Sequence, residues 1–142
     1  LSAGRDFDKS ATPFDVGLDK FVNMEKGNFI GKESLQRKTK VQKVMGLRVK
    51  NGIACLGSKI IYNKQCIGEV TSSSWSPYQE CGVSIVRLTN NYGELTSPVD
   101  VFDYKNNKLK AYICDLPMYD KKSEIVRGID KNIPKSPNPW FK

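Results

Sequence analysis

Strict alternation of apolar and polar residues constrains the fold of this sequence more than any other feature. In the stretch VQKVMGLRV, residues 41–49, the apolar side chains of Met45, Leu47 and Val49 recur at every second position. A period of two places such side chains on one face of a β-strand, whereas a helix needs a period near 3.6. The stretch therefore predicts a half-buried strand.

Further apolar runs, separated by turn residues, predict more strands. Two short runs flank Asn63-Lys64-Gln65 in a hairpin-like arrangement. Residues 81–88, CGVSIVRL, are rich in β-branched side chains. Residues 97–116 alternate strongly and turn at Asn106-Asn107, residue types that tolerate a positive φ. Five or six strands with little helix predict a mainly β fold, a small antiparallel β-barrel of about six strands or a sandwich.

The segments before the barrel predict little regular structure. Residues 11–24 predict a turn that leads into an extended segment. Residues 29–40 predict a short helix and a linker. Because a helix this short is not stable alone, we expect it to dock through Phe29, Ile30 and Leu35.

The barrel domain is predicted at residues 41–119, and the chain changes character after it. Residues 120–142 are charged and then interrupted by prolines. This composition predicts an extended C-terminal arm without regular structure. The side chains expected to pin the arm are Ile125, Val126, Trp140 and Phe141.

Composition excludes several kinds of chemistry. The 142 residues suffice for one ordinary domain with its own core. The absence of histidine removes the commonest general base and the usual activator of a serine or cysteine nucleophile. The four cysteines form no Cys-x-x-Cys pair, so we expect no zinc site and a reduced, cytoplasmic protein. No apolar run approaches the roughly 20 residues of a membrane-spanning helix.

Positive charge is concentrated in one part of the chain. The net charge is +8, and the segment from Lys20 to Lys50 holds nine Lys and Arg against two Glu. Such a surface attracts nucleic acid or a polyanionic small molecule, or is simply solvated. Nucleic-acid readers interleave exposed aromatic residues with basic ones, whereas this segment contains only Phe21 and Phe29. We therefore do not expect nucleic-acid binding.

The stretch SSSWSP, residues 72–77, lies between two apolar runs. Without histidine its serines have no activating base, so a catalytic role is not expected. The alternation predicts that one strand ends by Val70, that residues 72–77 form a crossing loop, and that the next apolar face begins at Val83. Ser72 and Ser76 are expected to bond local backbone groups.

Two motifs resemble the glycine-cleavage T-protein (aminomethyltransferase) family. Residues 12–35, TPFDVGLDKFVNMEKGNFIGKESL, resemble the end of the family's folate-binding domains, and GRDFDKSATP extends the likeness upstream. Residues 67–77 resemble the Ile-Gly-x-Val-Thr-Ser-x-x-x-Ser-Pro motif of the family's C-terminal barrel. The strand end YICDLPMY is also similar, with Met118 where an aromatic residue is usual. The resemblance covers residues 4–119.

The resemblance implies a one-carbon transferase that uses tetrahydrofolate. It implies that this chain is the last third of a longer protein, that residues 1–28 end an α+β folate-binding domain, and that the N-terminal portion binds most of the cofactor. The donor stays open: an aminomethyl group on a lipoyl-carrying partner, an N-methyl glycine derivative, or a sulfonium compound. Trp75-Ser76-Pro77 resembles the sulfonium-demethylating branch. A non-catalytic folate-binding relative, used for assembly or regulation, is the alternative.

The resemblance also implies where the site lies. The carboxylate near the transfer centre is upstream, so no catalytic residue and no metal ligand are assigned to this chain, which alone should show no turnover. For Trp75 the alternative is packing over a barrel mouth. For Arg5, with its neighbours Asp6 and Asp8, the alternative is a charged surface turn. The candidate cofactor-binding residues are Trp75, Tyr78, Tyr119 and Arg5.

Overall fold

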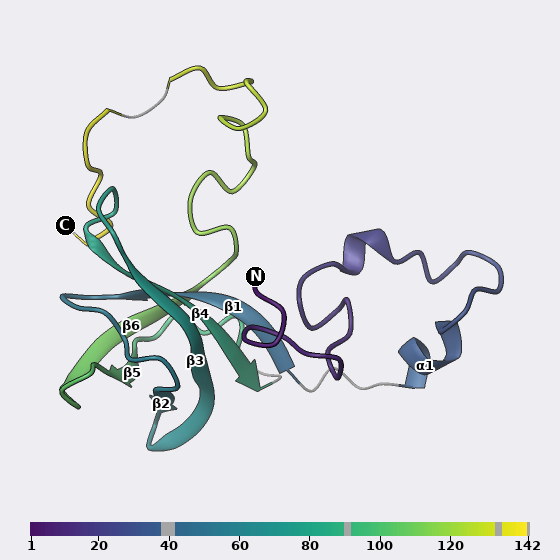
Figure 1. Ribbon diagram of the computed structural model, residues 1–142, viewed down its shortest axis with the longest axis horizontal. Coiled ribbons are helices and arrows are strands. Elements are labelled where there is room, and N and C mark those ends of the chain that lie inside the picture. The colour runs from purple at the N-terminus through teal and green to yellow at the C-terminus, as the bar shows by residue number, and fades with distance from the viewer. Residues whose placement is uncertain (38–41, 90–91, 133–134, 142) are drawn as a thin grey trace.

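The computed structural model describes residues 1–37, 42–89, 92–132 and 135–141, and its strands form a closed antiparallel barrel (Figure 1). Around the barrel the strand order is β1-β4-β3-β2-β5-β6. The prediction of a mainly β fold with a barrel of about six strands is confirmed. The strands are β1 (Gln42–Val49), β2 (Lys59–Tyr62), β3 (Gln65–Ser76), β4 (Cys81–Thr89), β5 (Val99–Phe102) and β6 (Lys108–Cys114).

Residues with positive φ form the two predicted hairpin turns. Asn63 and Lys64, between β2 and β3, have φ angles of 48° and 66°. These values lie in the left-handed region that a tight hairpin turn requires. Between β5 and β6, Asn106 has a φ of 62°, and the Asp103 carboxylate accepts the backbone N–H of Asn107. Both predicted hairpins are confirmed.

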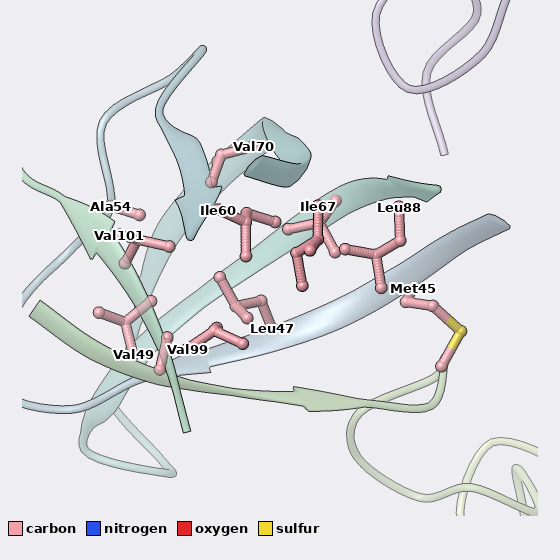
Figure 2. Packing of buried hydrophobic residues seen from close by; sticks show 12 residues of the cluster. Met45, Leu47, Val49, Ala54, Ile60, Ile67, Val70, Leu88, Val99 and Val101 are labelled. Carbon is pink, nitrogen blue, oxygen red and sulfur yellow. The ribbon is translucent and has the colours of Figure 1, made fainter. Parts of the chain in front are cut away.

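The barrel interior is the core, and the period-two pattern fills it. Met45, Leu47 and Val49 of β1 all point into the barrel, as predicted, and Figure 2 shows them facing side chains from the other strands. Burying one such aliphatic side chain stabilises the fold by about 1.5–3 kcal/mol. The core cluster consists of Met45, Leu47, Val49, Ala54, Ile60, Ile67, Val70, Val86, Leu88, Val99, Val101 and Ala111.

Strand β3 is longer than the sequence suggests. The prediction of a crossing loop at residues 72–77 is wrong, because β3 continues to Ser76 and stays paired with β4 up to the pair Ser76 and Cys81. A register shift between Val70 and Ser72 marks a β-bulge, which bends a strand without removing it from the sheet. Polar side chains on an outer face do not end a strand whose backbone remains paired.

The segment before the barrel extends away from it (Figure 1). It holds a short 3₁₀ helix, η1 (Asp19–Phe21), and α1 (Lys32–Arg37), which confirms the predicted short helix. The turn predicted in residues 11–24 is confirmed, because the Asp15 carboxylate accepts the Thr12 N–H and hydroxyl. The extended segment predicted to follow it is wrong, because η1 forms there. The predicted linker, residues 38–40, lies outside the described residues.

The helix α1 does not dock as expected. The sequence predicts contacts through Phe29, Ile30 and Leu35, but Ile30 is fully exposed and α1 buries none of its residues. No helix in the described ranges is long and apolar enough to cross a membrane.

The C-terminal arm contains neither helix nor strand in its described part, as predicted. It is not extended throughout, because the Ser123 N–H donates to the Asp120 carbonyl and the Arg127 N–H to the Ser123 carbonyl, which closes turns there. Trp140 and Phe141 pack against Tyr112 of β6, whereas Val126 is exposed and does not pin the arm. The arm is therefore held at its far end.

Substitution of Gly68, which belongs to the barrel motif, tests how closely β3 and β4 approach each other. A Cβ at this position would lie 2.3 Å from the Arg87 backbone oxygen and 2.9 Å from Leu88 Cδ2. Because a backbone oxygen cannot move aside without distorting the strand, we expect Gly68→Ala to lower the free energy of unfolding by about 1–3 kcal/mol. Urea denaturation measures this change.

Gly27→Ala is the matched control, because a Cβ there meets no atom within 4 Å. The control should leave the denaturation midpoint almost unchanged. Equal stability of the two variants would show that β3 and β4 are not packed as described.

Candidate functional site

An open groove of about 520 Å³ lies against strands β3 and β4. Its volume falls in the range of small-molecule sites. The turn between β3 and β4 and the start of the C-terminal arm border it. The lining residues are Ser72, Ser73, Ser74, Ser76, Tyr78, Gln79, Val83, Ser84, Ile85, Leu116, Pro117, Met118 and Tyr119.

Strand alternation explains which side chains form the floor of the groove. Val86 belongs to the core, so its neighbour Ile85 points outward from the barrel. Across the ladder Ser72 pairs with Ile85, and Ser74 pairs with Val83. The outer face therefore combines serine hydroxyls from β3 with aliphatic side chains from β4.

Two of the four predicted cofactor-binding residues meet at this groove. The rings of Tyr78 and Tyr119 pack edge to face, with centroids 4.9 Å apart. Tyr78 lies in the β3–β4 turn, whereas Tyr119 follows β6. Partial burial and a hydrogen bond with Tyr78 raise the pKa of Tyr119 above 10.0, so its hydroxyl stays protonated at neutral pH.

The other two predicted residues lie outside the groove. Trp75 stands between Ser74 and Ser76 in β3, and its side chain therefore points to the opposite side of the strand. Arg5 is exposed, and its carbonyl accepts a hydrogen bond from Arg87 Nη2 at 3.3 Å. A role for either in cofactor binding stays a prediction.

A buried carboxylate fastens the start of the chain to the groove. Asp6 is 1% exposed, so the expectation of a surface turn is wrong for this residue. Its Oδ1 accepts the hydroxyls of Thr71 at 2.7 Å and Ser72 at 2.8 Å, and its Oδ2 accepts the Ser2 N–H at 2.7 Å. Ser72 therefore bonds a distant side chain and not the local backbone, whereas Ser76 does accept the Gln79 N–H as expected.

A buried guanidinium joins two sides of the groove. Arg48 is 9% exposed, and its Nε donates to Gln79 Oε1 at 3.3 Å while its Nη2 donates to the Met118 carbonyl. No carboxylate in the described ranges forms an ion pair with it. Alternation alone would place Arg48 on the outer face, but nothing local in the sequence indicates that distant segments cover it.

The side chains that line the groove are suited to binding a ligand. None of the described residues that line it is charged, and the chain contains no histidine. Within the part of the chain that the structure describes, no group of three or more His, Cys, Asp or Glu is placed to hold a metal ion. Aliphatic side chains, serine hydroxyls and a tyrosine pair suit an uncharged, flat ring system with a few polar atoms.

Comparison with known proteins places this barrel in a family. The model of the glycine cleavage T-protein C-terminal barrel domain matches residues 42–120. An aminomethyltransferase of Prochlorococcus marinus (strain NATL1A) is 31% identical over 123 residues, which cover 83% of this chain and 33% of that protein. An aminomethyltransferase of Pseudothermotoga lettingae is 35% identical over 120 residues, 82% of this chain and 32% of that protein.

The fold also matches a solved structure. The glycine cleavage system aminomethyltransferase T from Bartonella henselae superposes with a TM-score of 0.70 at 23% identity, covering 85% of this chain and 36% of that one. The chain thus spans about a third of the length of the relatives it matches.

The pH dependence of stability tests the Asp6 network. Burial acts to raise the pKa of Asp6, but hydrogen bonds from Thr71, Ser2 and Ser72 outweigh it and hold the pKa below 3.8. A lowered folded-state pKa stabilises the fold above the unfolded pKa and loses this effect as the pH falls through the folded value. At pH 7, Asp6→Asn should lower the free energy of unfolding by about 1–3 kcal/mol, because one acceptor is replaced by a donor.

The difference between wild type and Asp6→Asn should shrink below about pH 4. Asp19→Asn, at an exposed position, is the control and should change the free energy of unfolding little. A difference that stays constant from pH 7 to pH 3 would contradict the ionised, hydrogen-bonded Asp6.

Proposed function

Because the chain belongs to the glycine cleavage T-protein family, through the C-terminal barrel domain at residues 42–120, we propose that it is the C-terminal part of an enzyme that transfers a one-carbon unit to tetrahydrofolate. Its curated relatives are named aminomethyltransferases. Since the chain spans only about a third of those relatives, the activity, substrates and partners of the whole protein all belong to the proposal.

The uncharged groove with its tyrosine pair supports a role in holding the cofactor's ring system. The p-aminobenzoyl ring of tetrahydrofolate is flat with apolar faces, which suits the side chains of Val83 and Ile85 and the rings of Tyr78 and Tyr119, whereas the reduced pterin is polar and needs hydrogen-bond partners. The Ser74 hydroxyl, exposed on the same face, is available to a polar ring atom. The anionic glutamate tail does not fit this lining, because no cation is among the lining residues.

In this function the chain contributes positioning. Transfer requires the folate nitrogen to stand in line with the electrophilic carbon of the donor, and effective positioning lowers the barrier substantially. Walls that fix the ring system and exclude water serve that purpose. The carboxylate that steadies the nearby positive charge belongs, by the family resemblance, to the part of the protein upstream of this chain.

The donor decides which branch of the family the protein represents. Three donors are to be tested with the whole protein and tetrahydrofolate: an aminomethylated lipoyl protein, dimethylglycine with an electron acceptor, and a sulfonium compound. Formation of methylene- or methyl-tetrahydrofolate with one of them supports the enzyme. Tight folate binding without turnover on any of them favours the non-catalytic relative.

Tyr119→Ala tests the placement of the cofactor. Loss of the ring removes an apolar wall and the partner of Tyr78, so the KM for tetrahydrofolate in the whole protein should rise about tenfold, which corresponds to about 1.4 kcal/mol. Steady-state kinetics at varied folate concentration measures this.

Tyr104→Ala is the control, because Tyr104 is exposed and lies outside the groove. It should leave KM unchanged. An equal effect of the two substitutions, or none from Tyr119→Ala, would place folate elsewhere.

A further inference from the structure

The C-terminal arm begins and ends at the groove. Residues 116–119, which lead from β6 into the arm, line one side. Figure 1 shows the arm leaving the barrel after β6 and returning toward the β3–β4 end. On return, the Asn138 N–H donates to the Tyr78 carbonyl at 2.7 Å and the Trp140 N–H donates to the Gln79 carbonyl at 2.9 Å. Tyr78 and Gln79 border the other side of the groove, so the arm bridges its two sides.

Arg48 also links the two sides of the groove. It donates to the Gln79 side chain on one side of the groove and to the Met118 carbonyl on the other. Its guanidinium carbon lies 4.8 Å from the centre of the Trp140 ring. A buried cation without a carboxylate depends on such neutral partners and on the face of an aromatic ring.

An aromatic cluster anchors the returning end to the barrel wall. The Trp140 ring lies 5.5 Å from the Tyr112 ring of β6 and 4.3 Å from the Phe141 ring. Lys50 Nζ lies 5.7 Å from the centre of the Phe141 ring. Arg48 belongs to β1, Tyr112 belongs to β6, and Lys50 directly follows β1, so the returning end is fixed to rigid strands.

We propose that Arg48 and Trp140 form a latch that sets the separation of the two sides of the groove, and that Trp140 is a positioning residue for the ligand bound there. Trp140 itself does not line the groove and acts through Gln79 and Arg48. Trp140 lies outside residues 42–120, which match the family's barrel domain. The latch therefore needs a residue from beyond that domain. That the ligand is tetrahydrofolate rests on the proposed function. The latch between Arg48 and Trp140 does not depend on that function.

Amide hydrogen exchange in the whole protein without ligand tests the latch directly. Trp140→Ala should accelerate exchange about tenfold at Gln79, whose N–H donates to Ser76 Oγ, and at residues 138 and 140, whose N–H groups donate to the Tyr78 and Gln79 carbonyls. Loss of the ring contacts with Arg48 and Tyr112 lets these bonds open more often. Trp140→Phe, which keeps an aromatic face for Arg48, should restore most of the protection. Val126→Ala, on the exposed middle of the arm, is the control and should change nothing.

Asn138→Pro tests the same latch without removing the tryptophan. It removes an exposed side chain and the N–H that bonds the Tyr78 carbonyl, and it places the proline Cδ against that oxygen, so the contact is broken. Residue 138 precedes Pro139, which already confines it to extended conformations that proline also adopts. The variant should fold even if Trp140→Ala does not, and should accelerate exchange at Gln79 and at Trp140, whose N–H groups donate to Ser76 Oγ and to the Gln79 carbonyl.

Titration with tetrahydrofolate completes the test. Trp140→Ala should raise the dissociation constant about 5- to 10-fold and leave kcat at saturating folate unchanged, whereas a general loss of folded protein would lower kcat without changing the dissociation constant. Unchanged exchange at Gln79 and at residue 140 in both variants would overturn the latch. Failure of the wild-type protein to bind tetrahydrofolate would overturn the proposed function, while the exchange result still decides the latch.

Discussion

Strand β1 pairs with β4 along one edge and with β6 along the other, and this double pairing closes the barrel. The barrel can close because glycines, which have no side chain, stand where neighbouring backbone segments approach most closely. A Cβ at Gly46 would meet Cys114 Sγ at 2.9 Å, and one at Gly82 would meet the Gly52 oxygen at 2.1 Å. With the strands fixed in this way, one face of each fills the core, and the outer face of β3 and β4 becomes a rigid floor for the groove.

Two buried charges attach irregular segments to this floor, and both rely on neutral partners. Asp6 accepts two hydroxyls and a backbone N–H, and so holds the start of the chain against β3. Arg48 donates to an amide oxygen and a carbonyl, and lies against the Trp140 ring. Breaking a satisfied buried charge is costly, so both segments are held firmly although neither contains a strand or helix of the barrel. The groove is thereby bordered by loops with fixed positions.

The sequence predicts the parts of the fold that depend on local pattern. Alternation in residues 41–49 and the turn residues Asn63 and Asn106 identify strands and hairpins, because side-chain direction and backbone φ are local properties. The continuation of β3 to Ser76 depends on pairing with β4 and on a bulge, which no local signal marks. Tyr78 and Tyr119, two of the predicted cofactor-binding residues, meet at the groove, whereas Trp75 faces away because one residue of strand register decides its side. The burial of Asp6 depends on hydroxyls 65 and 66 residues away and was beyond any local pattern.

The central claim is that the groove on β3 and β4 receives the ring system of tetrahydrofolate in the whole protein. Amide hydrogen exchange with and without saturating tetrahydrofolate tests it most directly. The account predicts slower exchange on binding at Tyr78 and Gln79 and at Met118 and Tyr119, with no change at the exposed β5–β6 turn around Asn106. Folate binding that leaves both groove segments unprotected would contradict the account.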